Sequence, residues 1–198
     1  MQTVAENILN EAKTLPEGAL ISAKEFLHLG TRAAVDQALA RLKQREELMP
    51  LYRGVYVRPV KTRFGMRAPA PEKVVEAIAA TRAETVVPHG AAAANALGLT
   101  TQVPTKLVYL TSGKSRTFKL GAQAVEMRHA PQWMLLPSHP QAGQAVRALT
   151  WLGEHRAPEA LAALKQKLPQ LAFNELAALR PALPEWLSKS ITQALAHG

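Results

Sequence analysis

The amino-acid sequence predicts an α+β fold in which a small helical domain with a β-hairpin precedes a mixed α/β domain that has a small antiparallel sheet and C-terminal helices. Three patterns support this prediction. Apolar residues recur at helical spacing in successive segments before residue 46, and the spacing becomes that of a hairpin over 48–57. The remainder contains short strand patterns and then helical ones. We therefore place the domains at 1–62 and 71–198, with a linker at 63–70.

The N-terminal domain begins with three predicted helices. Apolar side chains recur at helical spacing over 3–15, opposite polar ones. Ser22 and Glu25 form a capping box, in which the hydroxyl and the carboxylate satisfy free backbone amides, so a short second helix follows. Gly30 permits a sharp turn, and Thr31 can cap a third helix that continues to about residue 46.

The segment after these helices has the alternating pattern of a short hairpin. Apolar positions over 48–57 interleave with polar ones, and the turn falls near Arg53-Gly54. The order of three helices followed by a hairpin predicts a winged helix-turn-helix, with the hairpin as the wing. Residues 58–71 are rich in Arg, Lys, Pro and Gly without apolar periodicity, which is typical of a linker.

The second domain is expected to open with a helix from Pro71, whose buried stripe includes Val74 and Ile78. A small Ala-rich helix is predicted over 91–97. Strand patterns then follow at 107–110, 117–120 and 124–127. Proline-separated helices are expected near 141–153, 157–167, 171–179 and 184–196.

The third helix carries side chains suited to reading DNA bases. In a helix-turn-helix this helix enters the major groove, where Gln pairs with adenine, Arg pairs with guanine, and Ala contacts a thymine methyl. With the apolar stripe facing the core, Ala33, Gln37, Ala40 and Gln44 point directly outward. The alternative is an ordinary solvated helix face. The expected base-facing residues are Thr31, Arg32, Ala33, Asp36, Gln37 and Arg41.

Positive charge surrounds this helix. The chain has 24 Lys and Arg against 15 acidic residues, a net charge of +9, which favours a polyanionic partner. No acidic residue lies between Leu48 and Pro71. Phosphate contacts from such a segment supply affinity but little specificity, although wing tyrosines also commonly pack on the helices. The expected phosphate-facing residues are Tyr52, Arg53, Arg58, Lys61 and Arg63.

A second basic patch is predicted on the strands of the C-terminal domain. It has no acidic residue within it and could contact DNA, RNA or an acidic protein surface. The alternative is a sheet edge protected by Lys. The patch consists of Lys106, Lys114, Arg116 and Lys119.

Enzyme chemistry finds little support in the sequence. The chain has no Cys, and Asp36 is its single Asp, which disfavours thiolate sites and two-metal phosphoryl transfer. Gly113-Lys114-Ser115 lacks the glycine that a phosphate-binding loop needs five residues earlier. His89, in Pro-His-Gly, is more simply a capping residue. We therefore predict no enzyme activity, no catalytic residue, no metal and no cofactor.

The location of the protein is predicted from two further features. No apolar run is long enough to span a membrane, and the N-terminus has no secretory signal pattern. Together with the lack of Cys, this predicts a cytoplasmic protein without a membrane partner.

Several segments resemble AbiEi-family antitoxins of bacterial abortive-infection toxin–antitoxin systems, over about residues 1–130. Leu39-x-x-Leu42 followed by Leu51-Tyr-Arg-Gly-Val-Tyr-Val57 resembles their winged-helix domain. Arg63-Phe-Gly65, Gly90-Ala-Ala-Ala-Ala-Asn-Ala-Leu-Gly-Leu-Thr-Thr-Gln-Val-Pro104 and Val108-Tyr-Leu-Thr-Ser-Gly-Lys-Ser-Arg-Thr117 resemble one bacterial group of this family. The helical region after about residue 132 lies outside the resemblance.

This resemblance implies a repressor that binds inverted repeats of double-stranded DNA in its own promoter. It also implies a type IV antitoxin that counters a nearby-encoded nucleotidyltransferase-like toxin through its C-terminal domain, without a stable complex. We expect a monomer or weak dimer that binds DNA cooperatively. Two alternatives from other classes are a protein-interaction module that binds an acidic partner and an RNA-binding protein; few aromatic residues lie among the basic strands to stack on bases.

Overall fold

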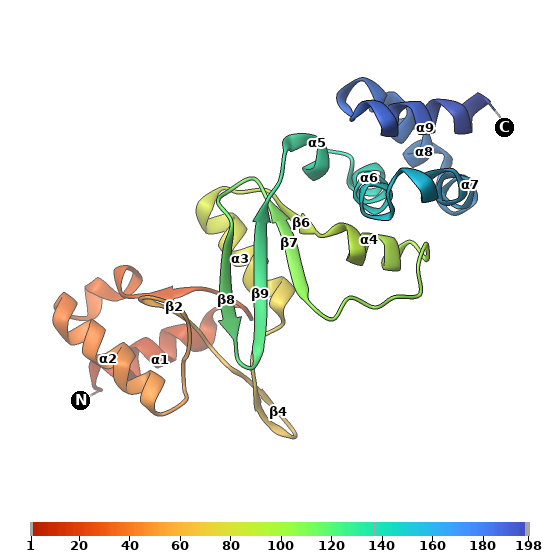
Figure 1. The fold of residues 1–198 in the computed structure, drawn as a ribbon. Coiled ribbons are helices and arrows are strands. Elements are labelled where there is room, and N and C mark those ends of the chain that lie inside the picture. The colour runs from red at the N-terminus through yellow and green to blue at the C-terminus, as the bar shows by residue number, and fades with distance from the viewer. Residues whose placement is uncertain (1, 137, 197–198) are drawn as a thin grey trace. The chain divides into compact units, whose positions relative to one another are not determined.

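The computed structural model describes residues 2–136 and 138–196. Contacts within the chain divide it into two compact units. Unit 1 consists of Met1–Glu84 and Arg116–Glu126, and unit 2 consists of Thr85–Ser115 and Met127–Gly198. Figure 1 shows the path of the chain and the labels of its elements. The fold is α+β, as the sequence predicts.

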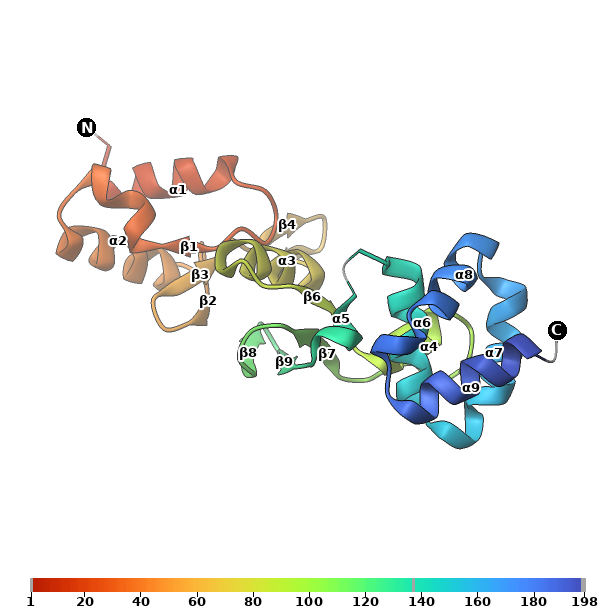
Figure 2. The ribbon, with the colours of Figure 1, turned by 90° about the horizontal axis from the view of Figure 1, so that it is seen from above.

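Unit 1 begins with the predicted helices α1 (Val4–Thr14), η1 (Ala23–Leu29) and α2 (Arg32–Gln44). Helices α1 and α2 pack side by side (Figures 1 and 2). The second helix is a 3-10 helix rather than an α-helix, and the predicted Ser22–Glu25 capping box is present at its start. These helices enclose one apolar core, made of Ala5, Ile8, Ala12, Ile21, Ala23, Phe26, Val35, Ala38, Leu39, Leu42 and Leu48.

A three-stranded sheet completes the winged helix-turn-helix. Its order is β1-β3-β2, with β1 (Ile21–Ser22), β2 (Met49–Tyr52) and β3 (Val55–Val57). The predicted wing is therefore the β2–β3 hairpin. β1 has only two residues, too few to show an alternating pattern, and the sequence did not predict it; it pairs antiparallel with β3, placing Ile21 opposite Tyr56.

The segment predicted as a linker contains a second hairpin. Strands β4 (Val60–Thr62) and β5 (Gly65–Arg67) pair antiparallel, with Thr62 opposite Gly65. Helix α3 (Pro71–Arg82) follows and belongs to unit 1 by its contacts. The sequence does not predict this hairpin, because the hairpin buries no side chain and so leaves no apolar alternation.

A four-stranded sheet has the order β6-β7-β9-β8, from β6 (Val86–Pro88), β7 (Leu107–Thr111), β8 (Arg116–Leu120) and β9 (Gln123–His129). The sequence predicts three of these strands. β6 pairs antiparallel with β7. Within unit 2, the backbone N–H of Ala130, just after β9, donates to Thr111 O at the end of β7 at 3.0 Å. These two strands therefore run in the same direction, and the sheet is mixed.

Unit 2 is otherwise helical, and the four C-terminal helices follow the predicted ranges closely. Its helices are α4 (Gly90–Ala96), α5 (Gln132–Leu135), α6 (Pro140–Leu152), η2 (Glu154–Arg156), α7 (Ala157–Lys167), α8 (Gln170–Ala178), η3 (Arg180–Ala182) and α9 (Glu185–Ala196). Leu149, Leu161, Leu164, Leu176 and Leu187 are among the fully buried side chains of their shared core.

Helices α4 and α6 approach each other closely (Figure 1). A Cβ atom at Gly90 would lie 2.4 Å from the carbonyl oxygen of Arg147, so only glycine fits there. Ala93 and Ala94, both buried, continue the contact. The run of small residues in α4 is thus explained by packing against α6.

Candidate nucleic-acid interface

The third helix of the winged helix-turn-helix, α2, starts at the predicted cap. The Thr31 hydroxyl accepts a hydrogen bond from Ala34 N at 3.3 Å. Val35, Ala38, Leu39 and Leu42 are buried on the inner side. A helix with one buried stripe must expose the opposite face, and the exposed residues include Ala33, Gln37, Ala40, Arg41 and Gln44. The expected outward face is therefore accessible within unit 1.

Arg32 and Asp36 form an ion pair on this exposed face. Arg32 Nε donates to Asp36 Oδ2 at 2.9 Å, and the two side chains are 62% and 52% exposed. The two residues are four positions apart, about one helical turn, which is a favourable spacing for opposite charges. Asp36 thus bonds the Nε of Arg32, and the two Nη groups take no part in this bond.

The wing places Arg53 at its turn, beside Gly54, whose φ of 74° suits a tight hairpin. Arg53 is exposed and Arg58 is half-buried. The Tyr52 ring lies 5.8 Å from Arg82 Cζ of α3, in a cation–π contact. Tyr52 is therefore half-buried by packing within unit 1, whereas Arg53 is directed to solvent.

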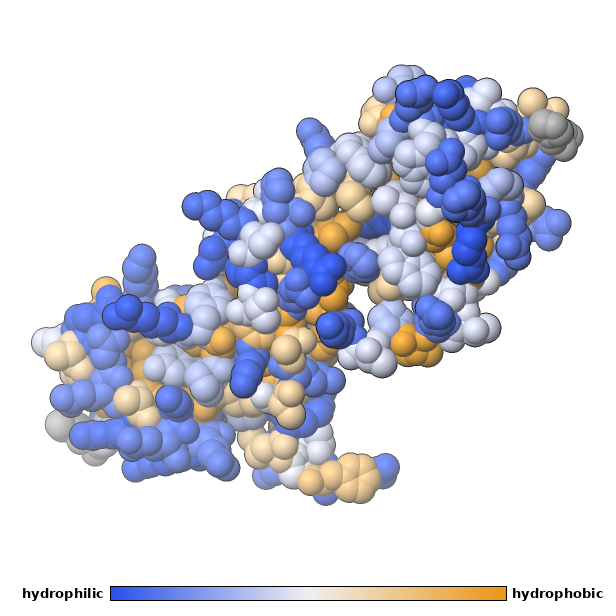
Figure 3. All heavy atoms as spheres, viewed as in Figure 1, coloured by the Kyte–Doolittle hydropathy of each residue, from blue (hydrophilic) through white to orange (hydrophobic). Residues whose placement is uncertain are grey.

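The second hairpin adds exposed cations beyond the wing. Lys61 and Arg63 are exposed, and Arg63 Cζ lies 4.6 Å from the centre of the Phe64 ring. The residues of α2, the wing and this hairpin that are expected to contact DNA all belong to unit 1. Figure 3 shows many hydrophilic side chains, with some apolar ones between them, on the visible surface around α1 and α2.

Glu17 anchors the base of the second hairpin. Its Oε1 accepts from Ala70 N at 2.8 Å and from Arg67 Nη1 at 3.0 Å. The backbone N–H of Ala70, and then the Arg67 side chain, hold the pKa of Glu17 below its ordinary value. The sequence gives no local sign of this anchor, because its partners lie 50 and 53 residues from Glu17.

The second basic patch is divided between the units. Lys106 and Lys114 belong to unit 2, whereas Arg116 and Lys119 belong to unit 1. Arg116 is only 18% exposed and forms a bidentate ion pair with Glu84, one bond of which joins Nη1 to Oε1 at 3.0 Å. Its charge is thus balanced inside unit 1, while the other three side chains are exposed.

Two polar residues of unit 2 hold its backbone together. His89 Nδ1 accepts from Ala91 N at 3.2 Å, so His89 caps α4, as expected for a Pro-His-Gly turn. Arg147, buried in α6, donates from Nη1 to the carbonyls of Met134 and Leu135 at the end of α5. Burial lowers the pKa of Arg147 to about 10.

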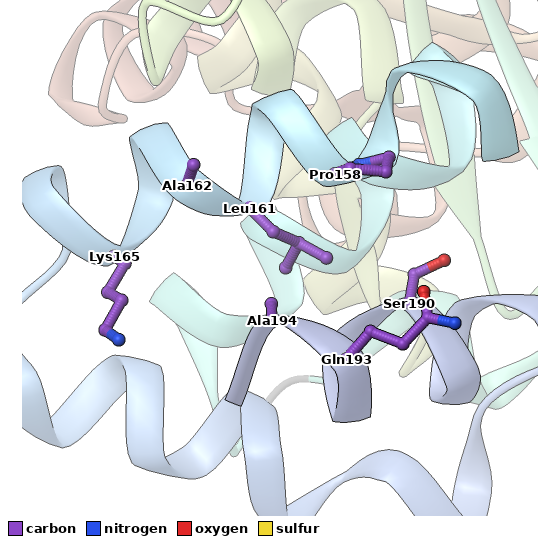
Figure 4. A pocket seen from close by; sticks show the side chains of 7 residues that line it. All are labelled: Pro158, Leu161, Ala162, Lys165, Ser190, Gln193 and Ala194. Carbon is purple, nitrogen blue, oxygen red and sulfur yellow. The ribbon is translucent and has the colours of Figure 1, made fainter. Parts of the chain in front are cut away.

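Unit 2 also contains a groove of about 330 Å³ between α7 and α9. In Figure 4, Leu161 and Ala194 point toward each other across it. Ser190 Oγ donates to the carbonyl of Trp186 at 2.9 Å. The side chains that line the groove include no carboxylate or imidazole, and Lys165 is their one ionisable group. The groove is lined by Pro158, Leu161, Ala162, Lys165, Ser190, Gln193 and Ala194.

A more polar hollow of about 300 Å³ lies beside the end of β9 and includes Ser112 and His129. His129 Nδ1 is 2.9 Å from Gly113 O, and because a carbonyl oxygen can only accept, Nδ1 is the donor of this bond. Ser112 Oγ accepts from Thr85 N at 2.9 Å.

Residues 2–136 and 138–196 contain no cluster of three or more potential His, Cys, Asp or Glu metal ligands. No helix in the same residues combines the length and apolar character needed to cross a membrane.

Comparison with known proteins places the chain in one family. The model of DUF6088, described as a family of unknown function, matches residues 7–174. This range covers most of the chain, so the chain belongs to that family. No curated protein and no solved structure matches it.

Proposed function

We propose that this member of DUF6088 binds duplex DNA sequence-specifically, with α2 of its winged helix-turn-helix in the major groove. The observation that carries the proposal is the exposed outer face of α2, which begins at a capped Thr31 and holds Gln37 and Arg41. A helix buried on that face could not enter a groove. The N-terminal half of such a helix is the part that meets base edges.

The proposal gives separate roles to the residues of α2. Gln37 contacts adenine, and small Ala33 lets the helix approach closely or contacts a thymine methyl. Arg32 contacts guanine through its two Nη groups, because Asp36 already bonds its Nε. The ion pair restricts Arg32 before binding, which lowers the conformational entropy lost in the complex.

The surrounding cations supply affinity. Arg53 in the wing and Lys61 and Arg63 in the second hairpin are exposed and lie in a stretch without acidic residues. They contact phosphates, and the half-buried Arg58, directly after β3, adds a further cation. If about four to six phosphates are neutralised, log K falls with log salt at a slope of about −4 to −5.

The biological role that we propose follows the resemblance to AbiEi-family antitoxins. In this role the protein is a cytoplasmic repressor of its own operon and binds inverted repeats as two cooperating copies. The operon also encodes a nucleotidyltransferase-like toxin, which the protein counters without a stable complex. DNA recognition by α2 does not depend on the presence of a toxin. An experiment can therefore disprove the antitoxin role without disproving DNA binding.

Fluorescence anisotropy over a series of salt concentrations tests DNA binding. The probes are the duplex directly upstream of the protein's own reading frame, a shuffled duplex of equal length, and the RNA of the same sequence. The proposal expects tight binding to the first probe and the steep slope above. Equal affinity for the shuffled duplex, stronger binding to RNA, or a slope near zero would overturn it.

A further inference from the structure

The β4–β5 hairpin ends in apolar side chains that are exposed rather than packed in a core. Phe64 is 86% exposed and Met66 is 59% exposed, whereas the wing before it packs Leu51 and Val57 into unit 1. None of the residues Val60–Arg67 is buried. Figure 3 shows the apolar atoms at the end of the hairpin, which projects from unit 1 in Figure 1. Folding of unit 1 therefore gives no reason for a phenylalanine here.

The turn of the hairpin is held in one conformation. Thr62 and Gly65 pair across the strands, so Arg63 and Phe64 form a two-residue turn at the end. Thr62 Oγ1 accepts from Phe64 N at 3.2 Å and donates to Gly65 O at 2.9 Å. Gly65 has a φ of 114°, a conformation that L side chains rarely adopt. Phe64 is thus presented by an ordered turn, and little ordering entropy is lost when it binds.

The charges near Phe64 indicate an anionic partner. Arg63 lies over one face of the Phe64 ring, with Cζ 4.6 Å from its centre, and Lys61 is exposed on the preceding strand. Glu17 neutralises Arg67 at the base of the hairpin, and the stretch from Leu48 to Pro71 has no acidic residue. A narrow end that combines an aromatic ring with cations matches a surface that offers both stacked bases and phosphates.

We propose that the β4–β5 hairpin enters the minor groove beside the major-groove site of α2, and that Phe64 inserts as a wedge at one base step. This inference rests on the proposed DNA binding. Apolar side chains inserted in this way partly unstack the bases and kink the duplex by about 20–90°. Arg63 and Lys61 contact the phosphates that flank the step. Steps that unstack easily, such as TA and CA, are therefore preferred there.

The test compares the wild type with Phe64→Ala on the duplex upstream of the protein's own reading frame. End-to-end fluorescence energy transfer measures the bend, permanganate reactivity of thymines measures unstacking, and anisotropy measures affinity. We expect Phe64→Ala to lose the bend and the reactive thymine and to bind about ten times more weakly, with an unchanged salt slope. Phe64→Leu, which keeps apolar volume, should retain most of the bend.

Two controls make the result specific. Leu171→Ala truncates another apolar side chain that is 73% exposed, in unit 2, and should change none of these measurements. Arg63→Ala should lower the salt slope by about one, as expected for loss of one phosphate contact. Because Phe64 is exposed, its replacement should leave the thermal unfolding of the protein unchanged.

The outcomes separate the wedge from the proposed function. If the wild type and Phe64→Ala bind the duplex with the same affinity and bend, the wedge is wrong while DNA binding stands. If the wild type fails to bind any duplex, the proposed function itself fails. If Phe64→Ala instead dissociates a dimer in light scattering and leaves the bend intact, the end of the hairpin is a protein contact and the inference is overturned.

Discussion

The wing and the β4–β5 hairpin follow each other in the chain and both turn at an arginine, yet they differ in what they bury. In the wing, Val57 is fully buried and Leu51 is 5% exposed. In the second hairpin all residues from Val60 to Arg67 are exposed or half-buried. The wing is thus part of the core of unit 1. The second hairpin contributes little to that core, so its ordered end points to binding rather than to folding.

The largest expected effect tests whether the wing, unlike the second hairpin, is needed for the stability of unit 1. Leu51→Ala should lower the free energy of unfolding by about 2–5 kcal/mol, because it opens a cavity in the core. Met66→Ala, a similar truncation in the second hairpin, should change it by less than about 0.5 kcal/mol. Urea unfolding followed by far-ultraviolet circular dichroism measures both variants.

Tryptophan fluorescence supplies an internal control for these variants. Trp133, Trp151 and Trp186 all lie in unit 2, so their emission reports that unit. The tryptophan transition should stay unchanged in Met66→Ala. A loss of stability in Met66→Ala as large as in Leu51→Ala would show that the second hairpin is a structural element after all.

A second prediction separates base reading from phosphate contact. Gln37→Ala or Arg32→Ala should relax the preference at one base position, at a cost of about 1–3 kcal/mol on the preferred duplex. Arg53→Ala in the wing and Arg63→Ala in the second hairpin should weaken preferred and shuffled duplexes alike. Anisotropy with single-base variants of the preferred duplex distinguishes the two patterns.

Arg41→Ala extends this test along α2, because Arg41 is also exposed and expected to face bases but lies a turn beyond Gln37. If the α2 variants weaken all duplexes equally, α2 is not the reading helix. If Arg53→Ala changes base preference, the wing reads bases and the roles of the two elements are exchanged.

Local signals explain which parts of this fold could be predicted. Thr31 and the Ser22–Glu25 pair cap helices through neighbours three residues away, and both were readable from the sequence. The Arg116–Glu84 ion pair joins residues 32 apart, so nothing near Arg116 showed that its charge is used inside unit 1. Likewise the second hairpin depends on hydrogen bonds at its turn and on an anchor at Glu17, and neither produces an apolar pattern.

The turn glycines of the two hairpins give a third, smaller prediction. Gly65→Ala strains a backbone with φ of 114°, and a Cβ there meets no atom within 4 Å, so the cost is conformational alone. We expect a cost of about 1 kcal/mol. Because the hairpin buries little, this cost should appear as faster hydrogen exchange of the amides in Val60–Arg67 rather than as weaker global stability.

Gly54→Ala is the corresponding substitution in the wing, to be compared with Gly65→Ala in the second hairpin. Gly54 has a φ of 74° and its Cβ would likewise meet no atom within 4 Å. The strain is similar, but the wing shares the core of unit 1, so here the free energy of global unfolding should fall. If Gly65→Ala also lowers global stability, the two hairpins unfold together and the distinction between them is lost.

The smallest effect concerns pH and the anchor of the second hairpin. The Ala70 N–H and then Arg67 hold the pKa of Glu17 below its ordinary value of 4.5. The unfolded chain therefore takes up the proton first as pH falls. The contribution of Glu17 is complete above the unfolded pKa and is lost as pH falls through the lower folded pKa. Acidification should then lower the protection of amides at the base of β4–β5, measured against the exchange of the free peptide at the same pH, before it affects the wing.

Glu17→Gln isolates this titration, because a glutamine cannot ionise but can still accept from Ala70 N. In the variant, the exchange of amides in Val60–Arg67 should be faster than in the wild type at neutral pH and should converge with it below the folded pKa. Thr3 lowers the pKa of Glu6 in α1, but Glu6 is present in both proteins and its effect cancels in the difference. No difference at any pH would mean that the Glu17 charge does not hold the hairpin, and that the backbone bond to Ala70 alone is sufficient.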